Sequence, residues 1–146
     1  MTIRPWSAIV LVGLVVCMLL SGCGQRFEYA EVSGKVSMGG HALAGVFVTF
    51  FPDDDGPEQL PYSMGTTDAN GIYKLTTTTG KPGALVGTHR VVVNWPSRDR
   101  REPNTPEPSP PIPVPYTVAT DTPLKVEVKA GPPQAIDLTL NLNSKK

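Results

Sequence analysis

The sequence contains few of the residues from which catalytic and metal centres are built. Its 146 residues include two histidines, His41 and His89, and two cysteines, Cys17 and Cys23. Two histidines cannot form a three-histidine zinc site, and no Gly-x-Ser-x-Gly motif is present to hold a serine nucleophile. This inventory argues against an enzyme, and we expect neither a metal site nor a cofactor.

Net charge and long apolar runs are also missing. The 13 Lys and Arg residues balance 13 Asp and Glu residues, whereas nucleic-acid binding calls for a basic patch or stripe. The longest apolar run, residues 8–20, is about 13 residues long, and a membrane-spanning helix needs ~20. We therefore expect no nucleic-acid partner and no retained transmembrane helix.

The apolar run has the layout of an export signal. Arg4 precedes it, and its end leads through Leu20, Ser21 and Gly22 directly into Cys23. These four residues resemble the lipobox of bacterial lipoproteins. The resemblance implies that residues 1–22 are a signal peptide and that the Cys23 sulfur carries a diacylglycerol, with further acylation of the new amine giving a permanent membrane anchor. The alternative is a plain secretory signal followed by an ordinary cysteine.

The residues after the lipobox bear on location. Gly24 stands where some lipoproteins retained in the inner membrane have aspartate, so the resemblance favours the outer membrane. We expect a protein of the cell envelope, facing out of the cytoplasm, with residues 23–29 as a tether. Removal of residues 1–22 would take Cys17 away and leave Cys23, with its sulfur acylated, as the only cysteine, so we expect no disulfide framework. A single domain with an apolar core must supply the stability.

From residue 30 onward, apolar and polar residues alternate with the period of a half-buried strand. We expect a strand at 32–38, a central strand at 46–51, a hairpin of 62–67 with 72–79 around the turn 68–71, a strand at 88–95, and a terminal hairpin of 124–129 with 136–142. Gly34 falls on a buried row, which suggests close packing or a bulge. The pattern predicts an all-β domain at residues 30–142, a single antiparallel two-sheet β-sandwich, followed by a polar tail at 143–146.

A proline-rich insert at residues 96–115 interrupts this pattern. Seven of the thirteen residues from Pro103 to Pro115 are proline, which removes amide donors and favours extended polyproline II backbone. No strand can run through the insert. Two roles stay open for it, a passive spacer and a ligand for an aromatic groove on a partner.

Four segments carry a second resemblance. The segments 32–36, 43–50, 67–73 and 87–93 are similar to the carboxypeptidase regulatory-like, or transthyretin-like, β-sandwich family. Small bacterial lipoproteins of this type also have a proline-rich insert before a tyrosine, here Tyr116. The resemblance implies an immunoglobulin-like sandwich that acts as an accessory domain. It departs from the family at Ala42, where proline is usual, and residues 143–146 lack the Tyr-Arg-Gly-Ser ending of the related hydroxyisourate hydrolases.

Two surface clusters offer weaker candidate sites. Asp53, Asp54 and Asp55, with Glu58, Asp68 or Asn70, could supply oxygen ligands to Ca²⁺, but the spacing lacks the EF-hand pattern and a solvated acidic turn after a strand is the favoured interpretation. Arg98, Arg100 and Arg101 could contact anionic envelope polymers, but Asp99 and Glu102 are interleaved with them.

Two function classes follow. The favoured one is a non-catalytic, lipid-anchored module that binds an envelope protein or polysaccharide, or has a structural role. The alternative is a small hydrolase or an accessory subunit of an envelope enzyme. Cys23 is the one residue to which the sequence assigns a specific chemical outcome.

Overall fold

The computed structural model describes residues 27–54, 59–100, 103 and 111–143. The lipobox, Cys23, the first part of the tether and residues 101–102 and 104–110 of the proline-rich insert lie outside the described residues. The described part contains strands, turns and two short 3-10 helices, and no α-helix, which confirms the prediction of an all-β domain. No helix in this part is long and apolar enough to span a membrane.

The elements are β1 (Tyr29–Ala30), β2 (Val32–Met38), β3 (His41–Ala42), β4 (Phe47–Pro52), β5 (Ser63–Thr66), β6 (Ile72–Lys74), β7 (Thr76–Thr77), β8 (Ala84–Leu85), β9 (Gly87–Asn94), η1 (Arg98–Arg100), η2 (Val114–Thr117), β10 (Lys125–Val128), β11 (Gln134–Ala135) and β12 (Leu138–Leu140).

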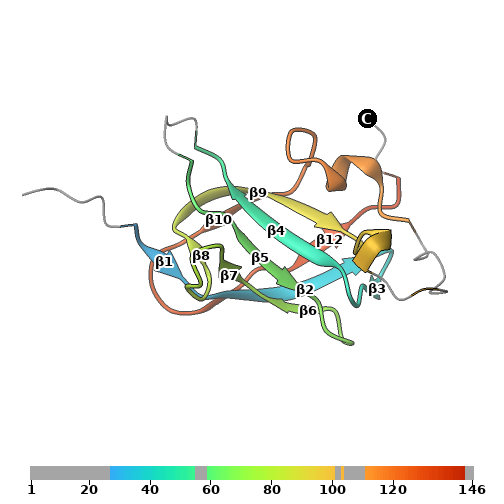
Figure 1. Ribbon diagram of the computed structural model, residues 1–146, viewed down its shortest axis with the longest axis horizontal. Helices are drawn as coiled ribbons and strands as arrows, with labels where there is room; N and C mark the ends of the chain where they lie inside the picture. Colours follow the sequence, from blue (N-terminus) through green and yellow to red (C-terminus); the bar gives the residue numbers. More distant parts are fainter. Residues whose placement is uncertain (1–26, 55–58, 101–102, 104–110, 144–146) are drawn as a thin grey trace, which may run out of the picture.

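One five-stranded sheet is antiparallel throughout, in the order β10-β9-β4-β5-β7. The predicted central strand is β4, which lies between β9 and β5 (Figure 1). Its inward residues Val48 and Phe50 are fully buried. The β-branched and aromatic residues on its other face are half-buried, as expected for a strand that packs on both sides.

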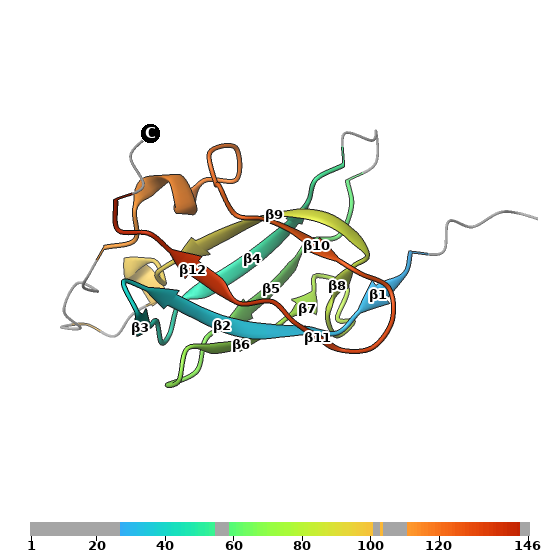
Figure 2. The ribbon, with the colours of Figure 1, turned by 180° about the vertical axis from the view of Figure 1, so that it is seen from behind.

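The second five-stranded sheet is built around β2 (Figure 2). Strands β3 and β6 pair with β2 in antiparallel fashion, whereas β11 and β12 pair with it in parallel. The predicted purely antiparallel arrangement is therefore wrong at this edge. The reason is topological: β10 ends beside Gly87, and the loop that follows runs to the end of the domain where β2 starts (Figures 1 and 2). The next strand can then only run in the same direction as β2.

The terminal hairpin is also a wrong prediction. Strand β10 pairs with β9 in one sheet, while β11 and β12 pair with β2 in the other. The predicted inward residues are right for Val128, Leu138 and Leu140, which are buried. Alternation fixes the face of a strand that points into the core, but not the neighbour with which the strand pairs. Residues 129–133 therefore connect two sheets instead of closing a tight turn.

The predicted hairpin at 62–79 is correct in one part and wrong in another. Strand β5 pairs with β7 as expected, but β6, between them in sequence, pairs with β2 in the other sheet. The turn itself forms: the Asp68 carboxylate accepts hydrogen bonds from the amides of Asn70 (2.8 Å) and Ile72 (2.9 Å). The pairing of the two arms ends at Met64 and Thr76, and at Gly65 the backbone of β6 crosses so closely that a Cβ atom would lie 2.3 Å from the carbonyl oxygen of Lys74.

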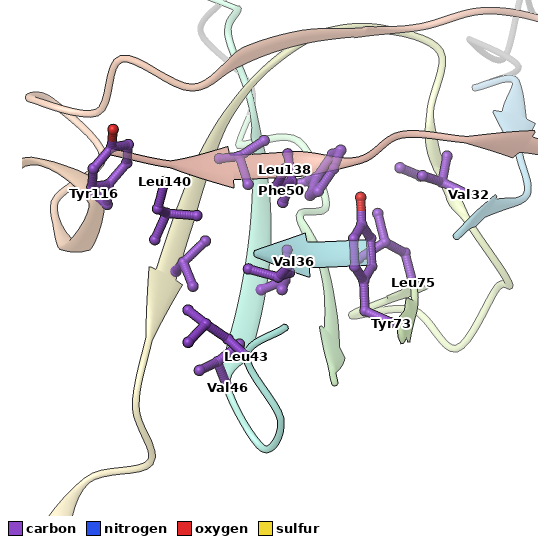
Figure 3. Packing of buried hydrophobic residues seen from close by; sticks show 14 of the residues in the cluster. Val32, Val36, Leu43, Val46, Phe50, Tyr73, Leu75, Tyr116, Leu138 and Leu140 are labelled. Atoms are coloured by element: carbon purple, nitrogen blue, oxygen red, sulfur yellow. The ribbon is translucent and has the colours of Figure 1, made fainter. Parts of the chain in front are cut away.

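Side chains from both sheets form one hydrophobic core (Figure 3). The predicted inward residues of β2 are buried, as are Tyr73 and Leu75. The Tyr73 ring, from the β2 sheet, lies 6.1 Å from the Phe50 ring of the other sheet, centroid to centroid. The core therefore joins the two sheets through aromatic contacts.

Gly34 is the point of closest approach in the β2 sheet. A Cβ atom at this position would lie 1.9 Å from the carbonyl oxygen of Ile136, which confirms the predicted close packing. The Tyr73 hydroxyl donates a 2.5 Å hydrogen bond to the same oxygen. One residue on, the Lys35 amide donates to the Asp137 carboxylate at 2.8 Å. The backbone between β11 and β12 does not pair with β2 at this point, and the Asp137 side chain accepts the hydrogen bond from the Lys35 amide instead.

The described residues of the proline-rich insert contain no strand, as predicted. The chain re-enters the core at Ile112, which is buried, and at Tyr116 in η2. The Tyr116 hydroxyl accepts a 2.9 Å hydrogen bond from the amide of Asn141. This bond ties the end of the insert to the chain that follows β12.

Candidate functional site

The residues that the sequence singled out lie in different parts of the domain. Cys23, Asp55, Glu58 and Arg101 lie outside the described residues. Arg98 and Arg100 begin and end η1, whose backbone is closed by a 2.9 Å hydrogen bond from the Arg100 amide to the Ser97 carbonyl. Among the described residues, the His, Cys, Asp and Glu side chains form no group of three that could hold a metal ion.

The acidic turn after β4 forms ion pairs with cations from the neighbouring strands. Asp53 forms an ion pair with Arg90 of β9 and a second one with Lys125 of β10, at 3.3 Å. The hydrogen bond from Arg90 is the main cause that lowers the pKa of Asp53, and Lys125 adds to it. Asp68 uses its carboxylate in the turn before β6. Two of the proposed Ca²⁺ ligands therefore already have other partners.

The two histidines lie on strands of different sheets. His41 is exposed in β3, whereas His89 points into the core from β9 and is 1% exposed. The imidazole of His89 contacts the Phe50 ring, with the two centroids 5.8 Å apart. Arg90, the next residue, faces outward to Asp53. No catalytic grouping of histidine, arginine and carboxylate is formed by these described residues.

A groove lies at the end of the domain that contains the β2–β3 turn. Its volume is about 690 Å³, and it is lined by Gly39, Gly40, Tyr116, Pro123 and residues 139–143. None of these described lining residues is charged. Leu140 is buried at its base, while Leu142 is 54% exposed. The Tyr116–Asn141 hydrogen bond fixes the wall of the groove, so the groove is built into the fold.

Three of these features were not predicted from the sequence: the core position of His89, the ion pairs of Asp53 and the groove. The inward position of His89 could have been predicted from the sequence, because His89, Val91 and Val93 are spaced by two residues and therefore point to the same face of the strand. No local pattern links Asp53 to Arg90, which is 37 residues away, or Tyr116 to Asn141. Comparisons of the chain with models of protein families, with curated proteins and with solved structures found no match.

Proposed function

We propose that this chain is a lipid-anchored β-sandwich of the cell envelope that acts without catalysis, as a binding or structural module. The proposal is supported by the positions and partners of the side chains that could take part in catalysis. Asp53, Arg90 and Asp68 are engaged in ion pairs or turn hydrogen bonds, and His89 faces the core, away from the exposed His41. Side chains with these partners stabilise a fold and leave no assembled general acid and base.

The fold in this proposal is a two-sheet sandwich of the carboxypeptidase regulatory-like, transthyretin-like kind. Two five-stranded sheets that share one core, with Phe50 against Tyr73, support this arrangement. The small β1–β8 pair lies at one end and β3 at the other (Figure 1). An anchor on Cys23 would hold the β1 end within about 20 Å of the membrane, since β1 begins at Tyr29, six positions after Cys23, and each residue spans at most ~3.5 Å.

In this geometry the groove lies at the end of the domain that faces away from the anchor. We expect contact with an envelope protein or polysaccharide at this end. A photo-crosslinking residue at position 142 should give adducts in intact envelopes, and purified unlabelled domain should compete with them. The same residue in place of Met64, which is 46% exposed on β5, is the matched control. Equal adducts at both positions would contradict a partner at the groove end.

The anchor is tested separately by fractionation. The full chain should sediment with membranes, and its mature N-terminus should be an acylated Cys23 in mass spectrometry. The Cys23→Ala variant should lose both the acyl mass and the membrane association. An unmodified Cys23, or a mature chain that starts elsewhere, would refute the lipoprotein assignment.

A further inference from the structure

His89 is a titratable side chain placed where a hydrophobic residue would be expected. It is 1% exposed and lies on the inward row of β9. In the strand register it stands opposite Val126 of β10 on one side and Pro52 of β4 on the other. Its ring packs against Phe50. The imidazole therefore fills the core beneath the sheet edge formed by β9 and β10.

The two ring nitrogens have unequal partners. Nδ1 lies 3.0 Å from the carbonyl oxygen of Gly87, and because a carbonyl only accepts, Nδ1 carries the proton of the neutral ring. Nε2 is buried and has no hydrogen-bond partner among the described residues. A second proton on Nε2 would leave both a charge and an N–H donor unsatisfied in the core.

Charged groups near His89 face away from it. Arg90 and Asp53 pair with each other, and Lys125 with Asp53, on the outward face of the sheet; Glu127 is exposed on the same face of β10. From the opposite sheet, the Tyr73 hydroxyl donates to a carbonyl, and Asp137 is exposed and accepts from the Lys35 amide. In η2, which also packs on β9, the Tyr116 hydroxyl accepts from an amide. No carboxylate of the described residues is thus placed to balance a charged imidazole.

We propose that His89 is an acid-operated latch: the β9–β10 edge of the sheet is closed while the imidazole is neutral and opens once the imidazole takes up a proton. Strand β10 is suited to open because it is an edge strand of four residues that pairs with β9 alone. Burial lowers the pKa of His89 below its ordinary value of 6.5, against the opposing effect of the Gly87 hydrogen bond, in agreement with this geometry.

The sign of the pH effect follows from proton linkage. The open state binds a proton with the ordinary histidine pKa, near 6.5, and the closed state binds it only at lower pH. Closure is therefore unaffected well above pH 6.5 and loses stability as the pH falls below it. Between pH 7.5 and 5.5 the closing equilibrium constant should fall by up to about tenfold, the limit set by the open-state pKa.

Hydrogen exchange of the lipidated full chain in detergent, corrected for intrinsic rates, tests the latch. Protection of the β10 amides should fall by up to about tenfold between pH 7.5 and 5.5, and protection of the β2 amides should fall less. The His89→Phe variant, which keeps a ring against Phe50, should lose this pH dependence, whereas His41→Gln should keep it. An equal loss in β2 and β10, or an unchanged pH dependence in His89→Phe, would overturn the proposal.

A second measurement covers the case in which His89→Phe does not fold. An NMR titration of the His89 ring in the unmodified sequence should show that β10 loses its protection in step with ring protonation. A ring that titrates with a midpoint near 6.5 while β10 stays protected would overturn the latch.

Discussion

Replacing Gly34 with alanine tests the closest backbone contact in the β2 sheet. The added Cβ atom would lie 1.9 Å from the Ile136 carbonyl oxygen and 3.0 Å from the Tyr73 hydroxyl. An ordinary contact begins at about 3.4 Å, so the backbone at Ile136, just after β11, or that of β2 must move by roughly 1.5 Å. Backbone cannot swing aside as the end of a flexible side chain can, and the shift breaks hydrogen bonds on both sides of the contact.

The cost can be built from those bonds. The Tyr73–Ile136 hydrogen bond and the 2.8 Å bond from the Ile136 amide to the Ser33 carbonyl hold the contact in place. Each contributes about 1 kcal/mol, and overpacking adds ~1–3 kcal/mol. The lower chain entropy of alanine in the unfolded state returns about 0.7 kcal/mol. We expect Gly34→Ala to lower the free energy of unfolding by about 2–4 kcal/mol, or roughly 10–15 °C in Tm.

Urea unfolding followed by the fluorescence of Trp95, which is packed against the core, measures this loss. Ser37→Ala, on the opposite face of the same strand, is the control and should change the free energy by less than about 0.5 kcal/mol. Tyr73→Phe should cost less in the Gly34→Ala background than alone, because the hydrogen bond is already broken there. A loss below about 1 kcal/mol, or strict additivity with Tyr73→Phe, would refute the register between β2 and the chain at Ile136.

Three further substitutions test other ties in the fold. Thr67→Val removes two buried hydrogen bonds from the turn before β4 and should destabilise the domain by about 1–3 kcal/mol in urea unfolding; Thr67→Ser should restore most of the loss. Asp53→Asn removes the carboxylate whose pKa the Arg90 hydrogen bond lowers below 3.8; the wild-type advantage in Tm should be present above pH 3.8, vanish as the pH falls below it, and shrink in 1 M salt. Tyr116→Phe leaves the Asn141 amide without its acceptor and should cost about 1 kcal/mol, with faster exchange of that amide as the direct readout. An unchanged exchange rate would show that water replaces the hydroxyl without loss.

The sequence predicts faces well and strand partners poorly. Alternation correctly placed Val36, Tyr73 and Leu138 in the core, because a period of two is a property of each strand alone. The terminal hairpin was wrong, and the hairpin at 62–79 was wrong in part, because sequence neighbours such as β10 and β11 joined different sheets. Which sheet a strand enters depends on core contacts that form once the whole chain is in place. A glycine such as Gly65 allows β6 to cross close to β5, but a glycine in a strand does not by itself predict such a crossing.

The same distinction explains which parts of the candidate site were predictable. The acidic turn after β4 is visible in the sequence, but its pairing with Arg90 depends on the register of β4 and β9. The inward position of His89 could be read from its spacing to Val91. The absence of a partner for Nε2 could not, because it depends on every element that packs against the ring.

In the described residues, long-range side-chain hydrogen bonds join segments that the strand ladders do not pair. The Tyr73–Ile136 and Lys35–Asp137 bonds link residues 63 and 102 positions apart, and Tyr116–Asn141 closes the segment after the insert. Each side chain meets a backbone group that the strand ladders leave unpaired, so its loss costs more than an exposed hydrogen bond would. Hydrogen bonds break and re-form with changes in solution conditions, so the stability of such a fold depends on those conditions. Disulfides are covalent and persist under the same changes. A buried imidazole such as that of His89 can therefore couple such a fold to pH, because each of these hydrogen bonds contributes only about 1 kcal/mol.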